Sequence, residues 1–172
     1  MALYAEQGFE NTTVAEIAER AGLTERTFFR HFTDKREVLF SGSGEFQELL
    51  VGSVANAPGS LPPIGAAAEG LLAAAAMLQQ REEFARQRAK IIAANAELQE
   101  RELIKLASLS AALADTLRGR GVTEPAASLT AEVAMAVFRT AFERWIDQAG
   151  GPGLPQLISD SIDELAALTA SR

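Results

Sequence analysis

Apolar positions recur at helical spacing along most of the chain, and the alternation of apolar and polar residues typical of a strand appears nowhere at length. Turn and cap residues divide the pattern, most clearly the Pro- and Gly-rich stretch 56–63 and the run Gly150–Gly153. The pattern therefore predicts an all-α protein. The helices we expect cover residues 2–7, 13–21, 24–32, 34–55 (with a weak point at 41–44), 63–80, 82–94, 96–119, 125–149 and 155–169.

Composition narrows the classes of protein. The 172 residues are 48% hydrophobic and include no cysteine, which excludes disulfides, thiolate metal sites and cysteine nucleophiles. No apolar run reaches the roughly 18 to 20 residues that span a bilayer, so we expect no membrane association. The lack of cysteine makes a reducing cytoplasm the simplest location. The first predicted helix is short at its front, which leaves open whether N-terminal residues, including a basic arm, are missing.

The charge balance is acidic, with a formal net charge of −7. Such a protein does not coat nucleic acid through bulk charge. Residues 1–40 hold five Lys or Arg against seven Asp or Glu, but residues 24–36 reverse this balance. Any contact with DNA must therefore come from the local placement of a few cations.

Residues 13–32, TVAEIAERAGLTERTFFRHF, have the spacing of a helix-turn-helix. Thr13 and Glu16 form the pattern of a capping box at the start of the first helix. Ala18 supplies the small residue that two closely crossing helices need, and Gly22 tolerates the positive φ of a sharp turn. The pattern predicts a compact pair of helices.

The second helix of this pair begins after Thr24 and has an inner and an outer face. We expect Leu23 to plug the turn and Phe28 to pack on the first helix. A hairpin in an ordinary helical protein is the alternative, but the caps, the buried positions and the polar outer face together favour a DNA-binding motif. The outward positions, which would face the major groove or the flanking phosphates, are Glu25, Arg26, Thr27, Phe29, Arg30 and His31.

Residues 8–39 resemble the DNA-binding domain of the tetracycline-repressor (TetR) family. The shared features are Gly8-Phe9, Thr12-Thr13, Gly22-Leu23-Thr24, the aromatic-rich run Phe28-Phe29-Arg30-His31-Phe32 and the helix start Lys35-Arg36-Glu37-Val38-Leu39. The resemblance covers about a fifth of the chain. It implies about nine helices, with a three-helix helix-turn-helix head at residues 1–40 and a helical body at 41–172 that binds a ligand and dimerises.

The resemblance also implies roles for single residues in binding DNA. Thr13 and Lys35 would bind phosphates at two helix starts, and Phe29 stands where Tyr is more usual, so that a hydroxyl contact is lost. His31 is the one histidine, and without partners we expect no metal role and no cofactor. The predicted DNA-binding residues are Thr13, Thr24, Arg26, Thr27, Phe29, Arg30, His31 and Lys35.

Two apolar stripes near the C-terminus predict a homodimer, because a helix that is apolar over a wide arc packs on its own core and on something else. Packing within one chain explains either stripe alone about equally well. The residues predicted at the interface are Val137, Ala141, Ile158, Ile162 and Leu165.

A pocket for a small-molecule effector is predicted in the middle of the body. The arginines between 81 and 101 form a solvated face in one interpretation, and in the other one of them enters the pocket to meet an anion. The runs 88–92 and 138–145 faintly resemble family members that bind acyl-CoA-like ligands. The predicted lining residues are Met77, Phe84, Arg88, Ile91, Asn95, Phe138 and Trp145.

Together these features predict a one-component transcription regulator, most simply a repressor, that binds a palindromic operator in double-stranded DNA and is released by a small apolar or amphipathic ligand. A helical interaction module that has lost DNA binding is the alternative. We expect no enzyme and no catalytic residue, since the sequence has no nucleophile–base pair, no clustered carboxylates on an apolar face and no phosphate-binding glycine loop.

Overall fold

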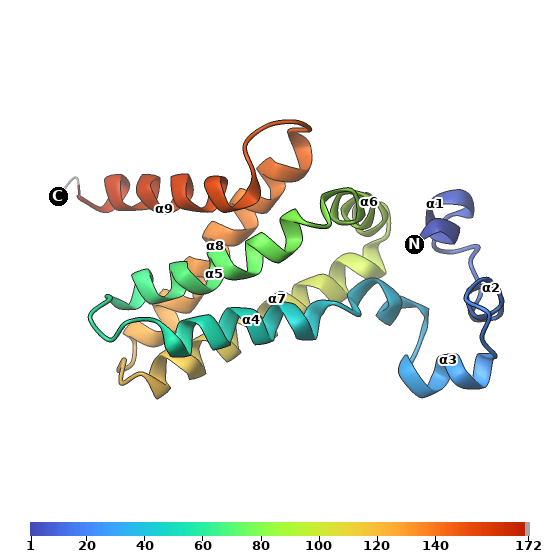
Figure 1. The fold of residues 1–172 in the computed structure, drawn as a ribbon, viewed down its shortest axis with the longest axis horizontal. Coiled ribbons are helices and arrows are strands. Elements are labelled where there is room, and N and C mark those ends of the chain that lie inside the picture. The colour runs from blue at the N-terminus through green and yellow to red at the C-terminus, as the bar shows by residue number, and fades with distance from the viewer. Residues whose placement is uncertain (171–172) are drawn as a thin grey trace. The chain divides into compact units, whose positions relative to one another are not determined.

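The computed structural model describes residues 1–170, and these are helical and joined by short loops, as predicted (Figure 1). Within this range no helix is both long and apolar enough to cross a membrane. The elements are α1 (Ala2–Gln7), α2 (Val14–Arg20), α3 (Glu25–His31), the 3₁₀ helix η1 (Lys35–Phe40), α4 (Ser43–Asn56), α5 (Pro63–Gln79), α6 (Glu82–Ala93), α7 (Ala96–Gly119), α8 (Ala126–Asp147) and α9 (Leu154–Ala170).

The helix-turn-helix forms at the predicted residues. Thr13 and Glu16 make the reciprocal bonds of a capping box at α2, and the Thr24 hydroxyl accepts a hydrogen bond from the backbone N–H of Thr27 at the start of α3. Gly22 has a φ of 66°, which a residue with a Cβ rarely adopts. Local sequence therefore determines where both helices begin and how the chain turns between them.

The prediction for Leu23 is wrong, because 46% of this residue is exposed and it does not plug the turn. The helices α2 and α3 pack on each other, and the residues that they bury are Ala18 and Phe28, each 2% exposed. The apolar residue in the turn faces solvent instead.

The chain forms two compact units. The first unit contains residues 1–43 and also 83–103, that is, most of α6 and the beginning of α7. This division differs from the predicted boundary after residue 40, because residues from α6 and α7 share a hydrophobic core with the N-terminal segment. That core consists of Tyr4, Phe9, Leu39, Phe40, Ile91, Ile92 and Leu98.

The second unit begins at Gly44, runs to Glu82 and resumes at Ile104. Its helices α5, α8 and α9 pack against one another in pairs. The guanidinium of Arg120 donates hydrogen bonds to the carbonyl oxygens of Val54 (2.9 Å) and Ala57 (2.7 Å), and so fixes the end of α4.

The contact of α5 with α4 depends on Gly70. A Cβ built at this position would lie 2.5 Å from Cγ2 of Val54 and 2.7 Å from the carbonyl oxygen of Leu50. Because one of these two atoms belongs to the backbone, it cannot turn aside as a flexible side chain can. Glycine therefore permits the close approach of the two helices.

We expect Gly70→Ala to lower the free energy of unfolding by about 1 to 3 kcal/mol, because the added methyl overfills a packed contact. Denaturant unfolding of the full chain measures this. Gly52→Ala is the matched control, since Gly52 also lies in a helix but a Cβ there meets nothing within 4 Å. It should lose no stability and gain up to about 1 kcal/mol. Equal stability of Gly70→Ala and wild type would contradict the packing argument.

Candidate DNA-binding interface

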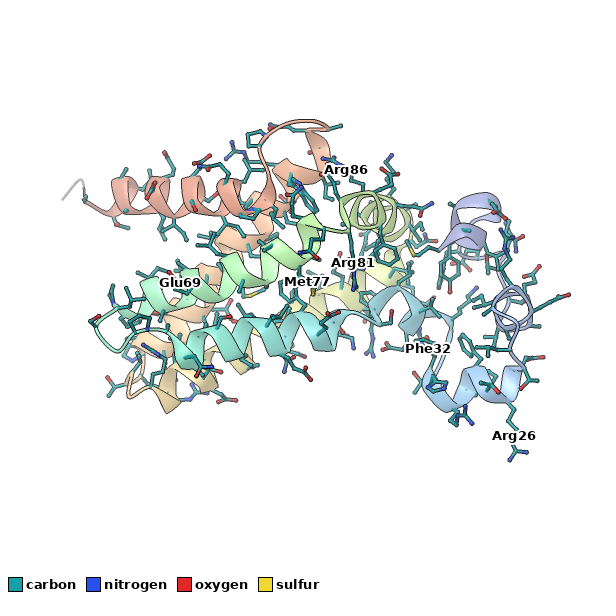
Figure 2. The ribbon with its side chains drawn as sticks, viewed as in Figure 1. Arg26, Phe32, Glu69, Met77, Arg81 and Arg86 are labelled. Atoms are coloured by element: carbon teal, nitrogen blue, oxygen red, sulfur yellow. The ribbon has the colours of Figure 1, made fainter. Side chains whose placement is uncertain are left out.

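The outer face of α3 brings together six of the eight residues predicted to bind DNA. Phe28 points inward, with its ring 5.2 Å from that of Phe32, and this fixes which face of α3 turns outward. Figure 2 shows Arg26 projecting away from the helix into solvent. Of the six residues, Thr27 is half-buried and the others are exposed: Thr24, Arg26, Phe29, Arg30 and His31.

Phe29 is unusual on this face, because 54% of a large apolar residue is exposed to solvent. Its ring meets Phe28 edge to face, with centroids 5.4 Å apart, so the backbone and the inner ring hold it in place. An apolar ring held outward beside Arg26 and Arg30 suits the sugars and the thymine methyl groups of a groove.

Thr13 is less available to a phosphate than the sequence suggested. A carboxylate oxygen of Glu16 accepts hydrogen bonds from the Thr13 backbone N–H and from its hydroxyl, both at 2.8 Å. These hydrogen bonds hold the pKa of the Glu16 carboxyl below its usual value. The bond from the Thr13 backbone N–H has the largest effect, followed by those from the Thr13 hydroxyl and the Gln7 side chain. The start of α2 therefore carries an anion of its own, which a phosphate would have to displace.

Lys35 also departs from its predicted role. Its ammonium donates hydrogen bonds to the carbonyl oxygens of Phe9, Glu10 and Thr12, at 2.8, 3.2 and 3.0 Å. It also lies 4.4 Å from the centre of the Phe9 ring. The ammonium is used inside the first unit, so we withdraw its predicted phosphate contact, while a contact through the Lys35 backbone N–H at this helix start stays a prediction.

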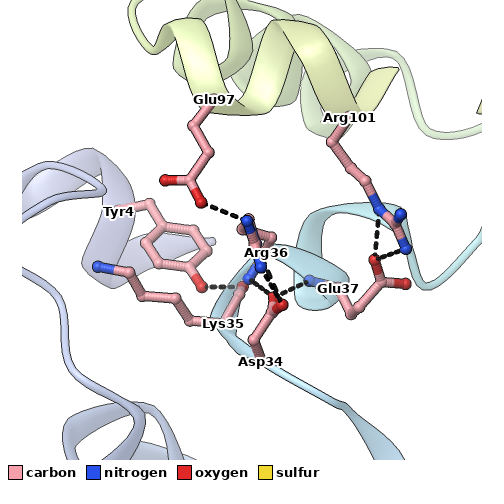
Figure 3. A network of polar contacts seen from close by, with 7 residues as sticks. All are labelled: Tyr4, Asp34, Lys35, Arg36, Glu37, Glu97 and Arg101. Atoms are coloured by element: carbon pink, nitrogen blue, oxygen red, sulfur yellow. Dashed lines mark hydrogen bonds and ion pairs between the residues drawn. The ribbon is translucent and has the colours of Figure 1, made fainter. Parts of the chain in front are cut away.

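The segment that follows α3 is held by a network of polar contacts (Figure 3). Asp34 caps η1 and accepts hydrogen bonds from the Arg36 guanidinium, which are the main reason that the pKa of Asp34 is lowered. Arg36 also pairs with Glu97 of α7. Figure 3 shows Arg101 of the same helix directed at the Glu37 carboxylate, to which two of its N–H groups donate at 2.6 and 2.8 Å.

Arg88 of α6 joins the same segment and does not stand free for an anionic ligand. Its Nε donates to the carbonyl oxygen of Leu39 at 2.8 Å, and its guanidinium lies 4.9 Å from the centre of the Phe40 ring. It also pairs with Glu102 at 2.8 Å. Arg88, which was predicted to line the ligand pocket, instead joins α6 to the end of η1.

The other predicted pocket residues are divided between the two units. In the first unit, Ile91 is buried in the core and Asn95 donates to the Ile91 carbonyl oxygen at 2.6 Å, while 44% of Phe84 is exposed. In the second unit, Met77 is half-buried. Phe138 and Trp145 are buried there and belong to a row of aromatic rings that also contains Phe46 and Phe142.

Two open hollows, of about 250 and 310 Å³, lie in the first unit, and the predicted pocket residues line neither of them. The larger one is formed by the end of α3 and the segment after it. It is lined by His31, Phe32, Thr33, Glu37, Phe40, Ser41 and Ser43. The ligand pocket stays a prediction.

Three residues predicted at the dimer interface are buried inside the second unit itself: Val137, Ala141 and Ile158. These positions face the chain's own core, so we correct their assignment. Ile162 and Leu165 are half-buried. The large apolar residues that α8 and α9 leave exposed are others, Leu129 and Leu168, at 61% and 70%.

Sequence reasoning missed the contacts that hold the segment 34–40. Arg101 and Glu37 lie 64 residues apart, and Arg36 and Glu97 lie 61 apart. No periodicity or cap signal connects such distant charges. The one local signal was Asp34, a typical N-cap residue before a helix start.

Comparison with known proteins agrees with this geometry. Residues 1–41 match the family described as bacterial regulatory proteins, tetR family, and residues 61–170 match the MftR C-terminal domain. The HTH-type transcriptional regulator TcmR of Streptomyces glaucescens is 38% identical over 64 residues, which are 37% of this chain and 28% of TcmR.

The solved structure of PfmR, a TetR family transcriptional regulator from Thermus thermophilus, has the same fold. The TM-score is 0.52 at 22% identity, over 94% of this chain and 91% of that one. The matched families together cover most of the sequence, and the helix-turn-helix lies where the first of them requires it. The chain therefore belongs to the tetR family of bacterial regulatory proteins.

Proposed function

We propose that this chain is a one-component transcription repressor that binds a palindromic DNA operator through α3. The outer face of α3 carries the proposal, because it presents Arg26, Arg30 and the Phe29 ring to solvent on a helix whose inner face is fixed by Phe28. A helix of this kind fits the major groove and reads base edges there. Acting on DNA, the protein would be cytoplasmic.

The acidity of the chain shapes how it would bind. Much of the negative charge near α3 is engaged internally, since Glu16 caps α2 and Asp34 pairs with Arg36. Arg26 and Arg30 remain directed outward, so attraction to phosphates is local and weak. We expect sequence-specific contacts to supply more of the affinity than in a basic repressor.

Binding to a palindrome requires two copies of α3 related by a twofold axis, which a homodimer supplies. We propose that the second unit dimerises through the outer faces of α8 and α9. Leu129 of α8 and Leu168 of α9 are exposed, and Ile162 and Leu165 of α9 are half-buried. Light scattering that gives a monomer mass at micromolar concentration would contradict this assembly.

We further propose that a small apolar or amphipathic ligand weakens DNA binding through α6 and the start of α7. These helices contact the segment between α3 and α4 through Arg88, Glu97 and Arg101. A ligand can shift this segment only if it favours one of two arrangements of these contacts. A body that binds none of a broad set of such compounds in thermal-shift assays would contradict a sensing role.

The Arg26→Ala variant tests whether Arg26 of α3 recognises a specific DNA base. The full chain is first used to select its operator from random duplexes. If Arg26 reads a guanine edge, the variant should lose about 1 to 3 kcal/mol on the selected operator and little on random DNA. Arg118→Ala is the matched control, because Arg118 is exposed on α7 in the second unit, outside the two helices proposed to dimerise. A wild type that selects no sequence would favour the alternative, a helical interaction module that has lost DNA binding.

Glu37→Gln tests the path from α7 to α3, since it removes the charge that pairs with Arg101. Coupling is reciprocal, so operator DNA should slow hydrogen exchange in residues 88–101 of the wild type. The variant should show less of this protection, and the exchanged pair Glu37→Arg/Arg101→Glu should regain part of it. Arg118→Gln, which breaks exposed ion pairs in the second unit, should leave it unchanged. Protection confined to residues 13–36 would contradict the path.

A further inference from the structure

The side chain of Lys35 and the hydroxyl of Tyr4 form a two-way clasp in the first unit. The Tyr4 hydroxyl donates to the Lys35 carbonyl oxygen at 2.5 Å, while the Lys35 ammonium donates to the carbonyl oxygens of Phe9, Glu10 and Thr12. An ammonium has three N–H groups, and three carbonyl oxygens receive them here. A phosphate could bind this ammonium only by displacing one of the carbonyls.

The loop before α2 is arranged around this cation. Thr12 is 1% exposed, and its hydroxyl donates to the Gly8 carbonyl oxygen at 2.7 Å, which turns the loop inward. Three carbonyl oxygens that converge on one point repel each other unless a cation lies among them. The Phe9 ring adds a further attraction at 4.4 Å. Without the charge of Lys35 this arrangement of the loop loses its partner.

The clasp closes the chain around the whole helix-turn-helix. The bond from Lys35 to Thr12 joins residues 23 apart in sequence, and both α2 and α3 lie between them. Burial raises the pKa of the Tyr4 hydroxyl above its usual value, and the charge of Asp34 adds to this. The hydroxyl is protonated at neutral pH in any case, so it can donate to the Lys35 carbonyl oxygen and contribute to the same closure.

We propose that Lys35 is a positioning residue for DNA binding: its ammonium keeps α2 and α3 closed in the arrangement that binds DNA and does not itself contact a phosphate. This inference rests on the proposed function. When a fraction of the molecules leaves the competent state, the apparent affinity falls by that fraction for every DNA. The contacts in the bound state stay the same, so the salt dependence of binding is unchanged.

The test compares Lys35→Met with wild type in the full chain. Fluorescence anisotropy at several salt concentrations measures binding to the selected operator and to random DNA, and hydrogen exchange follows residues 14–31. Lys35→Met should weaken both affinities by about 10-fold or more, as expected for losing charge-assisted hydrogen bonds, with the same salt slope. Exchange in residues 14–31 should rise by at least as large a factor, because the wild type is almost wholly closed and its open fraction starts from a small value.

Lys90→Met is the matched control, because it removes the same charge from an exposed lysine in the same unit and should leave affinity and exchange unchanged. If the plot of log affinity against log salt concentration is shallower by about one for Lys35→Met than for wild type, the ammonium contacts a phosphate and the proposal is overturned. Wild-type affinity in a folded Lys35→Met would overturn it too, since the residue would then serve stability alone.

If circular dichroism shows that Lys35→Met does not fold, Tyr4→Phe replaces it. This change removes one hydroxyl and keeps the buried ring, and it should weaken binding on both DNAs by a smaller factor with the same slope. Unchanged affinity and exchange in Tyr4→Phe would then count against the clasp. A wild type that binds no DNA overturns the proposed function instead, because the exchange measurement needs no DNA and still decides whether Lys35 holds α2 and α3.

Discussion

The segment from Asp34 to Phe40 is the part of the first unit on which the other contacts depend. It directly follows α3, and it is bonded on one side to α1 and the loop before α2, through Tyr4 and Lys35. On the other side it is bonded to α6 and α7, through Arg88 and Arg101. A short 3₁₀ helix has poor hydrogen bonds of its own, so these outside partners determine where it lies.

This arrangement explains how an acidic chain presents a cationic helix. Carboxylates near α3 have partners within the protein: Glu6 meets Arg20 at 3.0 Å, and Asp34 meets Arg36. Exposed ion pairs of this kind contribute little stability each. Their consequence here is that fewer uncompensated carboxylates lie near Arg26 and Arg30, the exposed arginines of α3.

The second unit is built on a different principle, in which small side chains allow helices to approach closely. Gly70 lies against α4, and buried alanines such as Ala74, Ala131 and Ala141 line α5 and α8. Close packing of this kind tolerates added volume poorly. It also accounts for the corrected interface, since Ala141 and its apolar neighbours are needed inside the chain.

The sequence by itself determined the helices and the helix-turn-helix, because these depend on local signals. Thr13, Glu16 and Thr24 cap helices through residues three positions away, and Gly22 meets a backbone requirement at its own position. The outward face of α3 followed from periodicity once Phe28 was placed inside. Such interactions involve neighbours in sequence, so a pattern can show them.

The tertiary structure decided what each distant charge and apolar stripe does. Lys35 and Arg88 are cations in suitable places for a phosphate or an anionic ligand, yet backbone carbonyl oxygens far away in sequence bind both of them. Val137 and Ile158 form a stripe that fits a core and an interface equally well. Which partner a side chain meets depends on the packing of elements more than 60 residues apart, and the spacing of residue types along the chain carries no record of it.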